Sequence, residues 1–192
     1  MISKASIRQS LRDQRILLEP DHIEACSLKV TENVLSIHYL QRAKKVALYN
    51  AHENEVDTIY LMRQLSRQGV ELYLPVMSDG SLLFYSYDID EQLSEAQYGI
   101  MQPVLQDKQP IDWSELDVMC LPLVAFDTQC FRLGRGGGFY DRALATSLTQ
   151  MKNKPWLIGL AYEFQCADKL PIEPWDVPLD AVSTESHVYY RA

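Results

Sequence analysis

The chain has few cysteines, and no two of them stand at metal-ligand or redox spacing. Its four cysteines, Cys26, Cys120, Cys130 and Cys166, lie far apart in the sequence. A zinc site or a disulfide framework is therefore not expected. Cys26 and Cys120 fit small core residues of a protein kept in a reducing compartment.

Long apolar runs and a surplus of positive charge are also missing. No segment reaches the roughly 20 apolar residues that a membrane-spanning helix needs. The first residues carry several basic side chains and no apolar core of signal-peptide length. The formal net charge is −8, which disfavours attraction to nucleic acid or to membranes. We therefore expect a cytoplasmic protein with no nucleic-acid or membrane partner.

Glycine is scarce as well, with 8 in the chain, yet four of these fall within positions 134–138. These glycines follow an apolar run at 118–124, and a helix-like run begins just after them at Tyr140. This order predicts a strand, a glycine-rich loop and a helix N-terminus. Backbone N–H groups of such a loop approach a ligand closely, and the helix dipole favours an anion. Arg132 and Arg135 can add forked hydrogen bonds, so the sequence predicts a phosphate site.

Two familiar phosphate motifs do not fit this segment. A P-loop needs Lys and then Ser or Thr after its last glycine, but Phe139 follows Gly138. The dinucleotide fingerprint needs a third glycine where Phe139 stands. The simpler alternative is a flexible surface turn with solvated arginines. Its place between a strand and a helix disfavours that interpretation.

The rest of the chain alternates between strand and helix patterns. We expect helices over 3–18, 20–40, 57–68 and 140–149, and strands over 45–49, 70–75, 82–87, 116–123, 156–161 and 180–184, with a turn at 79–80. Uninterrupted apolar strands indicate a largely parallel sheet that is covered on both faces. No repeat or domain boundary is found. The prediction is one α/β domain over 1–192, a three-layer α/β/α fold.

Two polar segments could approach a ligand. Residues 50–55 follow the strand at 45–49, and ligands of open α/β sheets gather at carboxyl ends of strands. Glu53 and Glu55 there could act as an acid, a base or a hydrogen-bonding group, or could simply favour the next helix N-terminus through its dipole. A basic stripe, defined as Lys4, Arg8, Arg12 and Arg15, recurs at helical spacing near the start of the chain. The pattern alone favours a solvated face.

At this point the chain resembles a known family, the 5-formyltetrahydrofolate cyclo-ligases, also called 5,10-methenyltetrahydrofolate synthetases. The resemblance is carried by Leu121-Pro122, by Ala-Phe-Asp at 125–127 and above all by residues 132–141. It extends over nearly the whole chain. Further matches are the Lys4 to Arg8 spacing, 49–51, 55–57, 74–75, 99–103, 158–162, Gln165, 175–176 and 179–180.

The resemblance implies a reaction. ATP phosphorylates the formyl oxygen of 5-formyltetrahydrofolate, the folate N10 attacks the activated carbon, the ring closes and phosphate leaves. The products are 5,10-methenyltetrahydrofolate, ADP and phosphate, and Mg²⁺ accompanies the phosphates. Such phosphoryl transfer depends on positioning and charge neutralisation. The expected partners are ATP and the folate, and the expected assembly is a monomer or a weak homo-oligomer.

The resemblance also implies residue roles. ATP would be bound by Lys4, Arg8, Arg132, Leu133, Gly134, Arg135, Gly136, Gly137, Gly138, Phe139 and Tyr140. The folate would be bound by Asn50, Glu55, Arg135, Gly136, Gly137, Gly138 and Phe139. Arg135 and Tyr140 would be catalytic, and Asp141 and Asp180 would bind Mg²⁺. Two alternatives stay open: the helix dipole alone could favour Asp141, and Tyr140 could be a core aromatic.

The chain departs from the family pattern at three positions. The family commonly has glycine at Cys130, tyrosine at Phe139 and glutamate at Gln102. These departures are expected to affect substrate affinity rather than the reaction. Two other functions compete: a sugar-phosphate isomerase that uses the anion loop without ATP, and a non-catalytic protein that only binds a nucleotide.

Overall fold

The computed structural model describes residues 3–78, 81–96, 99–148 and 153–192. Its centre is a seven-stranded sheet in the order β12-β11-β9-β6-β1-β2-β3. The strands are β1 (Lys45–Ala47), β2 (Glu71–Ser78), β3 (Ser81–Tyr87), β6 (Val118–Pro122), β9 (Trp156–Leu160), β11 (Ala181–Ser183) and β12 (Val188–Tyr190). The pairs from β11 to β2 are parallel, and only β12 and β3 pair antiparallel at the edges. The predicted largely parallel sheet is confirmed.

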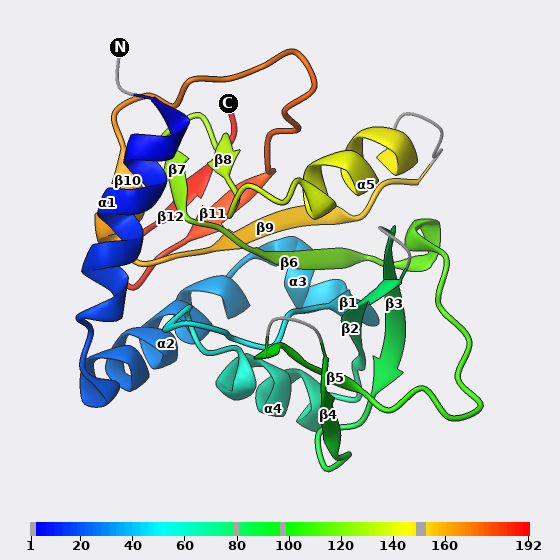
Figure 1. Ribbon diagram of the computed structural model, residues 1–192. Coiled ribbons are helices and arrows are strands. Elements are labelled where there is room, and N and C mark those ends of the chain that lie inside the picture. The colour runs from blue at the N-terminus through cyan, green and yellow to red at the C-terminus, as the bar shows by residue number, and fades with distance from the viewer. Residues whose placement is uncertain (1–2, 79–80, 97–98, 149–152) are drawn as a thin grey trace.

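Helices cover both faces of this sheet (Figure 1). They are α1 (Lys4–Ile16), α2 (Pro20–Leu35), α3 (His38–Arg42), α4 (Ile59–Arg67) and α5 (Phe139–Leu148). Figure 1 shows α2, α3 and α4 on one face and α5 on the other. The α2 and α4 residues Val34 and Leu65 pack in one core with Cys120 of β6, whereas Leu144 of α5 packs in a second core with Met119. Because β6 contributes to both cores, it is apolar throughout, and the three-layer prediction is confirmed.

Smaller elements complete the fold. A three-stranded sheet joins β10 (Cys166–Ala167), β7 (Ala125–Asp127) and β8 (Arg132–Leu133), and a two-stranded one joins β4 (Leu93–Glu95) and β5 (Met101–Pro103). Two short 3-10 helices span Trp113–Glu115 and Glu163–Gln165. Helix α1 packs through Ile7 and Leu11 against Ala125 and Leu133 of the three-stranded sheet. In the described part of the chain, no helix is long and apolar enough to cross a membrane.

Some predicted boundaries are wrong for local reasons. The helix expected over 20–40 ends at Leu35, where the Ser36 hydroxyl donates to the Asn33 carbonyl at 2.6 Å. Ile37 is extended before α3 begins, although its apolar side chain continues the helical pattern. The segment 88–115, to which the sequence pattern assigns no helix or strand, contains β4 and β5, and no strand is predicted where β12 lies. The turn expected at 79–80 lies outside the described residues, as does the last residue of the helix expected over 140–149.

Candidate functional site

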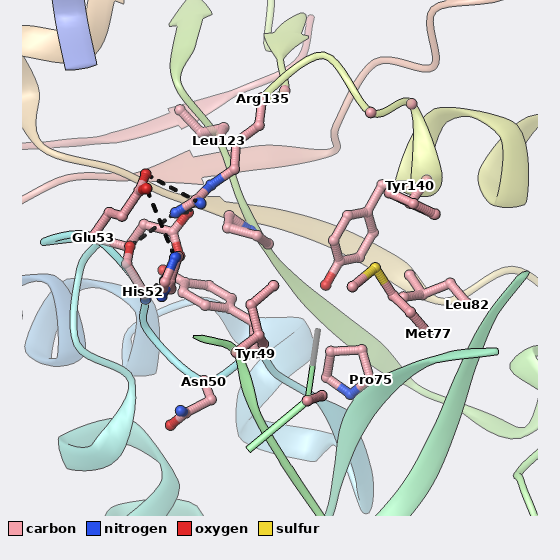
Figure 2. Close-up of a pocket in the computed structure, with 18 of the residues that line it drawn as sticks. Tyr49, Asn50, His52, Glu53, Pro75, Met77, Leu82, Leu123, Arg135 and Tyr140 are labelled. Carbon is pink, nitrogen blue, oxygen red and sulfur yellow. Dashed lines mark hydrogen bonds and ion pairs between the residues drawn. The ribbon is translucent and has the colours of Figure 1, made fainter. Parts of the chain in front are cut away.

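A cavity of about 710 Å³ opens beyond the carboxyl ends of β1, β2 and β6. Figure 2 shows its polar side, with Glu53, His52 and Arg135, facing an apolar side that carries Pro75 and Met77. The predicted site residues that line it are Asn50, Glu55, Arg132, Gly134, Arg135, Gly137, Gly138, Phe139, Tyr140 and Asp141. The fold therefore brings the two polar segments, 50–55 and 132–141, to one cavity, as expected for an open α/β sheet.

The glycine loop between β8 and α5 has a backbone that requires glycine. Gly136 has a φ of 107° and Gly138 a φ of 66°, a left-handed region that other residues adopt only with strain. A Cβ on Gly138 would also lie 2.7 Å from Arg142 Nη1. Arg8 Nε donates to the Gly134 carbonyl at 2.8 Å, so α1 holds the loop. These contacts argue against a solvated, flexible turn.

Arg132 is an almost fully buried cation at the base of this loop. Its Nη2 donates to Asp141 Oδ1 at 2.5 Å, which ties the loop to the first turn of α5. Burial lowers the pKa of Arg132, and the charge of Asp141 opposes that shift. In the described part of the chain, Arg132 Nε is buried without a hydrogen-bond partner. Such an orphaned donor beside a cavity fits an anionic ligand.

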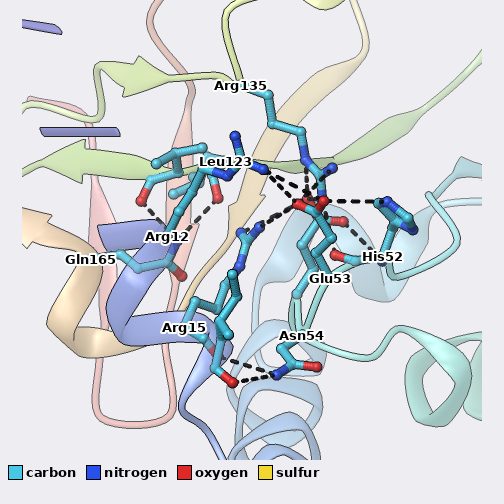
Figure 3. A network of polar contacts seen from close by, with 11 residues as sticks. Arg12, Arg15, His52, Glu53, Asn54, Leu123, Arg135 and Gln165 are labelled. Carbon is cyan, nitrogen blue, oxygen red and sulfur yellow. Dashed lines mark hydrogen bonds and ion pairs between the residues drawn. The ribbon is translucent and has the colours of Figure 1, made fainter. Parts of the chain in front are cut away.

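Arg135 pairs with the carboxylates of Glu53 and Glu55 on the polar side of the cavity (Figure 3). Its Nε and Nη2 donate to Glu55 Oε1 at 3.1 and 2.9 Å, and Nη1 lies 3.3 Å from Glu53 Oε2. Nη2 also donates to the His52 carbonyl at 2.9 Å. The Glu55 side chain is only 7% exposed, and its Oε2 accepts from the His52 N–H at 3.2 Å. The Glu55 carboxylate is thus buried and held by hydrogen bonds from Arg135 and the backbone.

The aromatic pair at the start of α5 faces the same space. Figure 2 shows the Tyr140 ring directed into the cavity toward Met77 and Leu82. The Arg132 guanidinium lies 5.6 Å from the centre of that ring. Burial raises the pKa of Tyr140 well above its usual range, so its hydroxyl is a neutral donor at physiological pH. Phe139 also lines the cavity.

Other predicted site residues lie outside the cavity lining. Lys4 Nζ pairs with Asp176 Oδ2 at 2.8 Å, and Gly136 packs over the Arg8 guanidinium. Leu133 is buried in the small core beside α1. Their roles stay predictions, as do those of the residues that line the cavity.

The two carboxylates expected to bind Mg²⁺ are not brought together. Asp141 lines the cavity, but Asp180 precedes β11 and lies near the amino ends of the parallel strands. Its Oδ2 accepts from the Leu157 N–H at 2.9 Å, and its Oδ1 lies 3.3 Å from Arg191 Nη2. Across the described residues, no group of three or more His, Cys, Asp or Glu side chains is placed to hold a metal ion.

Sequence reasoning missed part of the site. The basic stripe was expected to be solvated, and this is wrong for Arg15, which is only 2% exposed. Arg12 of the same stripe lines the cavity, as do His52, apolar residues of β2 and β3, and Ile100 and Met101. A helical pattern says which side chains share a face but not what packs on it. No sequence pattern indicates the apolar wall, defined as the cavity side that carries Pro75 and Met77, because its residues come from segments distant in sequence.

Two motif residues have structural roles. Cys130 is buried with a φ of 63°, the left-handed conformation that explains why glycine suits this position. Asp127 is also buried, and its carboxylate accepts backbone N–H bonds from Gln129, Phe131 and Leu170 at 3.0 to 3.1 Å. It therefore fixes the turn that leads into β8 and the glycine loop.

Asp127→Asn is expected to destabilise the fold by about 1–3 kcal/mol, because its amide nitrogen would face a backbone N–H donor. Chemical denaturation measures the loss. The exposed Asp168→Asn is the control, with an expected change within about 0.5 kcal/mol. An Asp127→Asn protein that unfolds at the same denaturant concentration as the original would contradict this role.

Comparison with known proteins gives a consistent result. The model of the 5-formyltetrahydrofolate cyclo-ligase family matches residues 1–185. The chain is 37% identical over 182 residues to a 5-formyltetrahydrofolate cyclo-ligase of Escherichia coli K12, covering 93% of this chain and 98% of that one. It is 37% identical over 180 residues to the enzyme of that name from Haemophilus influenzae, covering 92% and 94%. A solved structure of 5,10-methenyltetrahydrofolate synthetase from Aquifex aeolicus matches with a TM-score of 0.82 at 33% identity, covering 97% and 92%.

Proposed function

The chain belongs to the 5-formyltetrahydrofolate cyclo-ligase family, and from that premise we propose how its cavity converts 5-formyltetrahydrofolate into 5,10-methenyltetrahydrofolate. The family uses ATP as co-substrate. One observation supports the proposal most: a single cavity joins the arginine-bearing glycine loop to the buried carboxylate Glu55. The glycine loop suits a triphosphate, and the Glu55 carboxylate suits the N–H groups of a pterin ring.

We propose that the phosphates lie against residues 134–138 and the N-terminus of α5. Arg132 and Arg135 neutralise charge there, and Arg8 keeps the loop in place through the Gly134 carbonyl. Lys4, one helical turn from Arg8 and paired with Asp176, would act at the edge of the nucleotide site. This arrangement supplies the positioning and charge that phosphoryl transfer needs.

The folate would lie between Glu55 and the apolar side of the cavity. Glu55 accepts hydrogen bonds from the pterin, Asn50 lies nearby, and the apolar wall of Pro75 and Met77 covers the ring system. Phe139 and residues 135–138 contact both ligands where they converge. Burial of apolar ring surface and a few placed polar groups is the usual basis of such binding.

The chemistry proceeds in two steps in this proposal. The formyl oxygen attacks the γ-phosphorus of ATP, and ADP leaves. N10 then attacks the formyl carbon and loses its proton, the carbon–oxygen bond breaks, and phosphate departs with the former formyl oxygen. Arg135 stabilises the transferred phosphoryl group, and the neutral Tyr140 hydroxyl donates to it.

Magnesium fits this cavity through Asp141. Mg²⁺ commonly uses one or two carboxylates together with phosphate oxygens, and Asp141 stands in the first turn of α5 beside the proposed phosphates. When bound, the ion supplies further neutralisation of phosphate charge. Because Asp180 is held by Leu157 and Arg191 elsewhere, our proposal for the ion rests on Asp141.

The assembly and location follow from the same features. We propose a monomer or a weak homo-oligomer, because the cavity is built within one chain. We propose a cytoplasmic location, because all four cysteines are free thiols.

The test is a near-ultraviolet absorbance assay with purified protein, 5-formyltetrahydrofolate, ATP and Mg²⁺. The methenyl product is expected to accumulate only when both ATP and Mg²⁺ are present. No product with ATP still bound would favour a non-catalytic nucleotide-binding protein. No product and no ATP binding would favour a phosphorylated-sugar enzyme.

A further inference from the structure

Arg15 is a buried arginine that faces both carboxylates of the cavity (Figure 3). Its side chain is only 3% exposed. Nη1 lies 3.9 Å from Glu55 Oε1 and Nη2 lies 4.0 Å from Glu53 Oε2, which are ion-pair distances too long for hydrogen bonds. In the part of the chain that the structure describes, its Nε is buried with no hydrogen-bond partner. The guanidinium thus stands beside two acceptors without bonding fully to either.

This placement is energetically costly and is held by the backbone. Burial lowers the pKa of Arg15, and the charge of Glu55 opposes that shift. The Asn54 side chain donates to the Arg15 carbonyl at 3.2 Å, and Asn54 itself has a φ of 57°. The 52–55 turn is therefore fastened to the end of α1. Burying a charged side chain with an unpaired N–H group costs free energy. We therefore expect a ligand-bound arrangement in which this arginine is fully paired.

Arg135 cannot serve Glu55 and a phosphate in full at once. A guanidinium makes a forked contact either through Nε and Nη2 or through Nη1 and Nη2. Both forks need Nη2, whose two N–H groups already face Glu55 Oε1 and the His52 carbonyl at 2.9 Å. To grip a phosphate, Arg135 has to release Glu55. Among the described residues, Arg135 is the one cation that hydrogen-bonds to Glu55. A buried carboxylate that loses such a partner is strongly destabilised.

We propose that Arg15 is a positioning residue that takes over the Glu55 carboxylate when Arg135 turns to the phosphate, so that Glu55 stays paired and directed at the folate. The proposal rests on the roles proposed above for Glu55 and Arg135. A shift of about 1 Å brings Nη1 of Arg15 from its present distance to hydrogen-bond length. Arg15 does not contact the reacting atoms, and it acts through Glu55.

The first experiment measures binding by calorimetry in Arg15→Met and Arg15→Lys. Arg15→Met is expected to raise the Kd for 5-formyltetrahydrofolate about tenfold and to leave the Kd for ATP within about twofold. Arg15→Lys keeps the charge and is expected to raise the folate Kd about threefold. The matched control is Arg67→Met, which replaces an exposed arginine in the last turn of α4 and is expected to bind as the original does.

The second experiment is a double-mutant cycle with Glu55→Gln. If Arg15 acts through Glu55, adding Arg15→Met to Glu55→Gln changes the folate Kd by less than about twofold. A full further tenfold loss would overturn the proposal, since Arg15 would then act elsewhere. If Arg15→Met does not fold, Arg15→Lys takes its place in the cycle with Glu55→Gln. Effects of these two changes on the folate Kd that simply multiply would also overturn the proposal.

The outcomes separate this inference from the proposed function. An original protein that neither binds the folate nor turns it over contradicts both. An original protein that is active, with an Arg15→Met variant that binds the folate equally well, overturns only the role of Arg15. A thermal melt of each variant shows whether a loss of binding is merely a loss of folded protein.

Discussion

Arg135→Ala is expected to lower kcat by about 10³-fold and so nearly abolish turnover, while the protein stays folded. The side chain is 34% exposed, so its removal opens no cavity in the core. In our proposal Arg135 contacts the transferred phosphoryl group, and the transition state of phosphoryl transfer needs positive charge at that position. The measurement is kcat in the absorbance assay, with a thermal melt to check the fold.

Arg135→Lys sharpens this test. It keeps the charge but loses the fork, so its activity is expected to lie between those of the original and the alanine variant. Arg67→Ala removes an exposed arginine from α4 and is expected to be as active as the original. Near-normal turnover by Arg135→Ala would remove Arg135 from the mechanism.

Glu55→Gln is expected to weaken folate binding by about 2–3 kcal/mol and ATP binding by far less, because a buried charge-assisted contact is replaced by a weaker neutral one. The carboxylate is 7% exposed and already accepts from the His52 N–H and from Arg135. Calorimetric titrations of the same preparation with each ligand measure the two effects separately.

Glu53→Gln is the matched comparison for this prediction. Glu53 belongs to the same network, but its side chain is 35% exposed and solvent screens its charge. We expect it to change the folate Kd by no more than about threefold. Equal losses of folate and ATP affinity in Glu55→Gln would count against the assignment of Glu55 to the folate.

The glycine loop and the layered sheet were predictable because their signals are local. Four clustered glycines between a strand and a helix predict a tight loop at a helix N-terminus, and Gly136 and Gly138 have the positive φ values of such a loop. The apolar run at 118–124 likewise indicated a strand buried on both faces. Both inferences need only neighbouring residues.

The features that escaped prediction depend on contacts between distant segments. Arg15 is buried because residues 52–55 fold back over the end of α1, and the sequence of the helix carries no sign of that turn. The position of Asp180 before β11, where its carboxylate accepts from the Leu157 N–H, likewise depends on strand pairing that no local pattern shows. Ile100 and Met101 supply part of the apolar wall from the segment 88–115, to which the sequence pattern assigns no helix or strand.

The most direct test of the account follows the formyl oxygen through the reaction. 5-Formyltetrahydrofolate labelled with ¹⁸O in the formyl group is turned over with unlabelled ATP and Mg²⁺, and the released phosphate is analysed by mass spectrometry. If ATP phosphorylates the formyl oxygen in this cavity, each phosphate carries one ¹⁸O atom. Unlabelled phosphate, formed while the methenyl product accumulates, would contradict the phosphorylated intermediate and the role of the arginine-bearing loop in forming it.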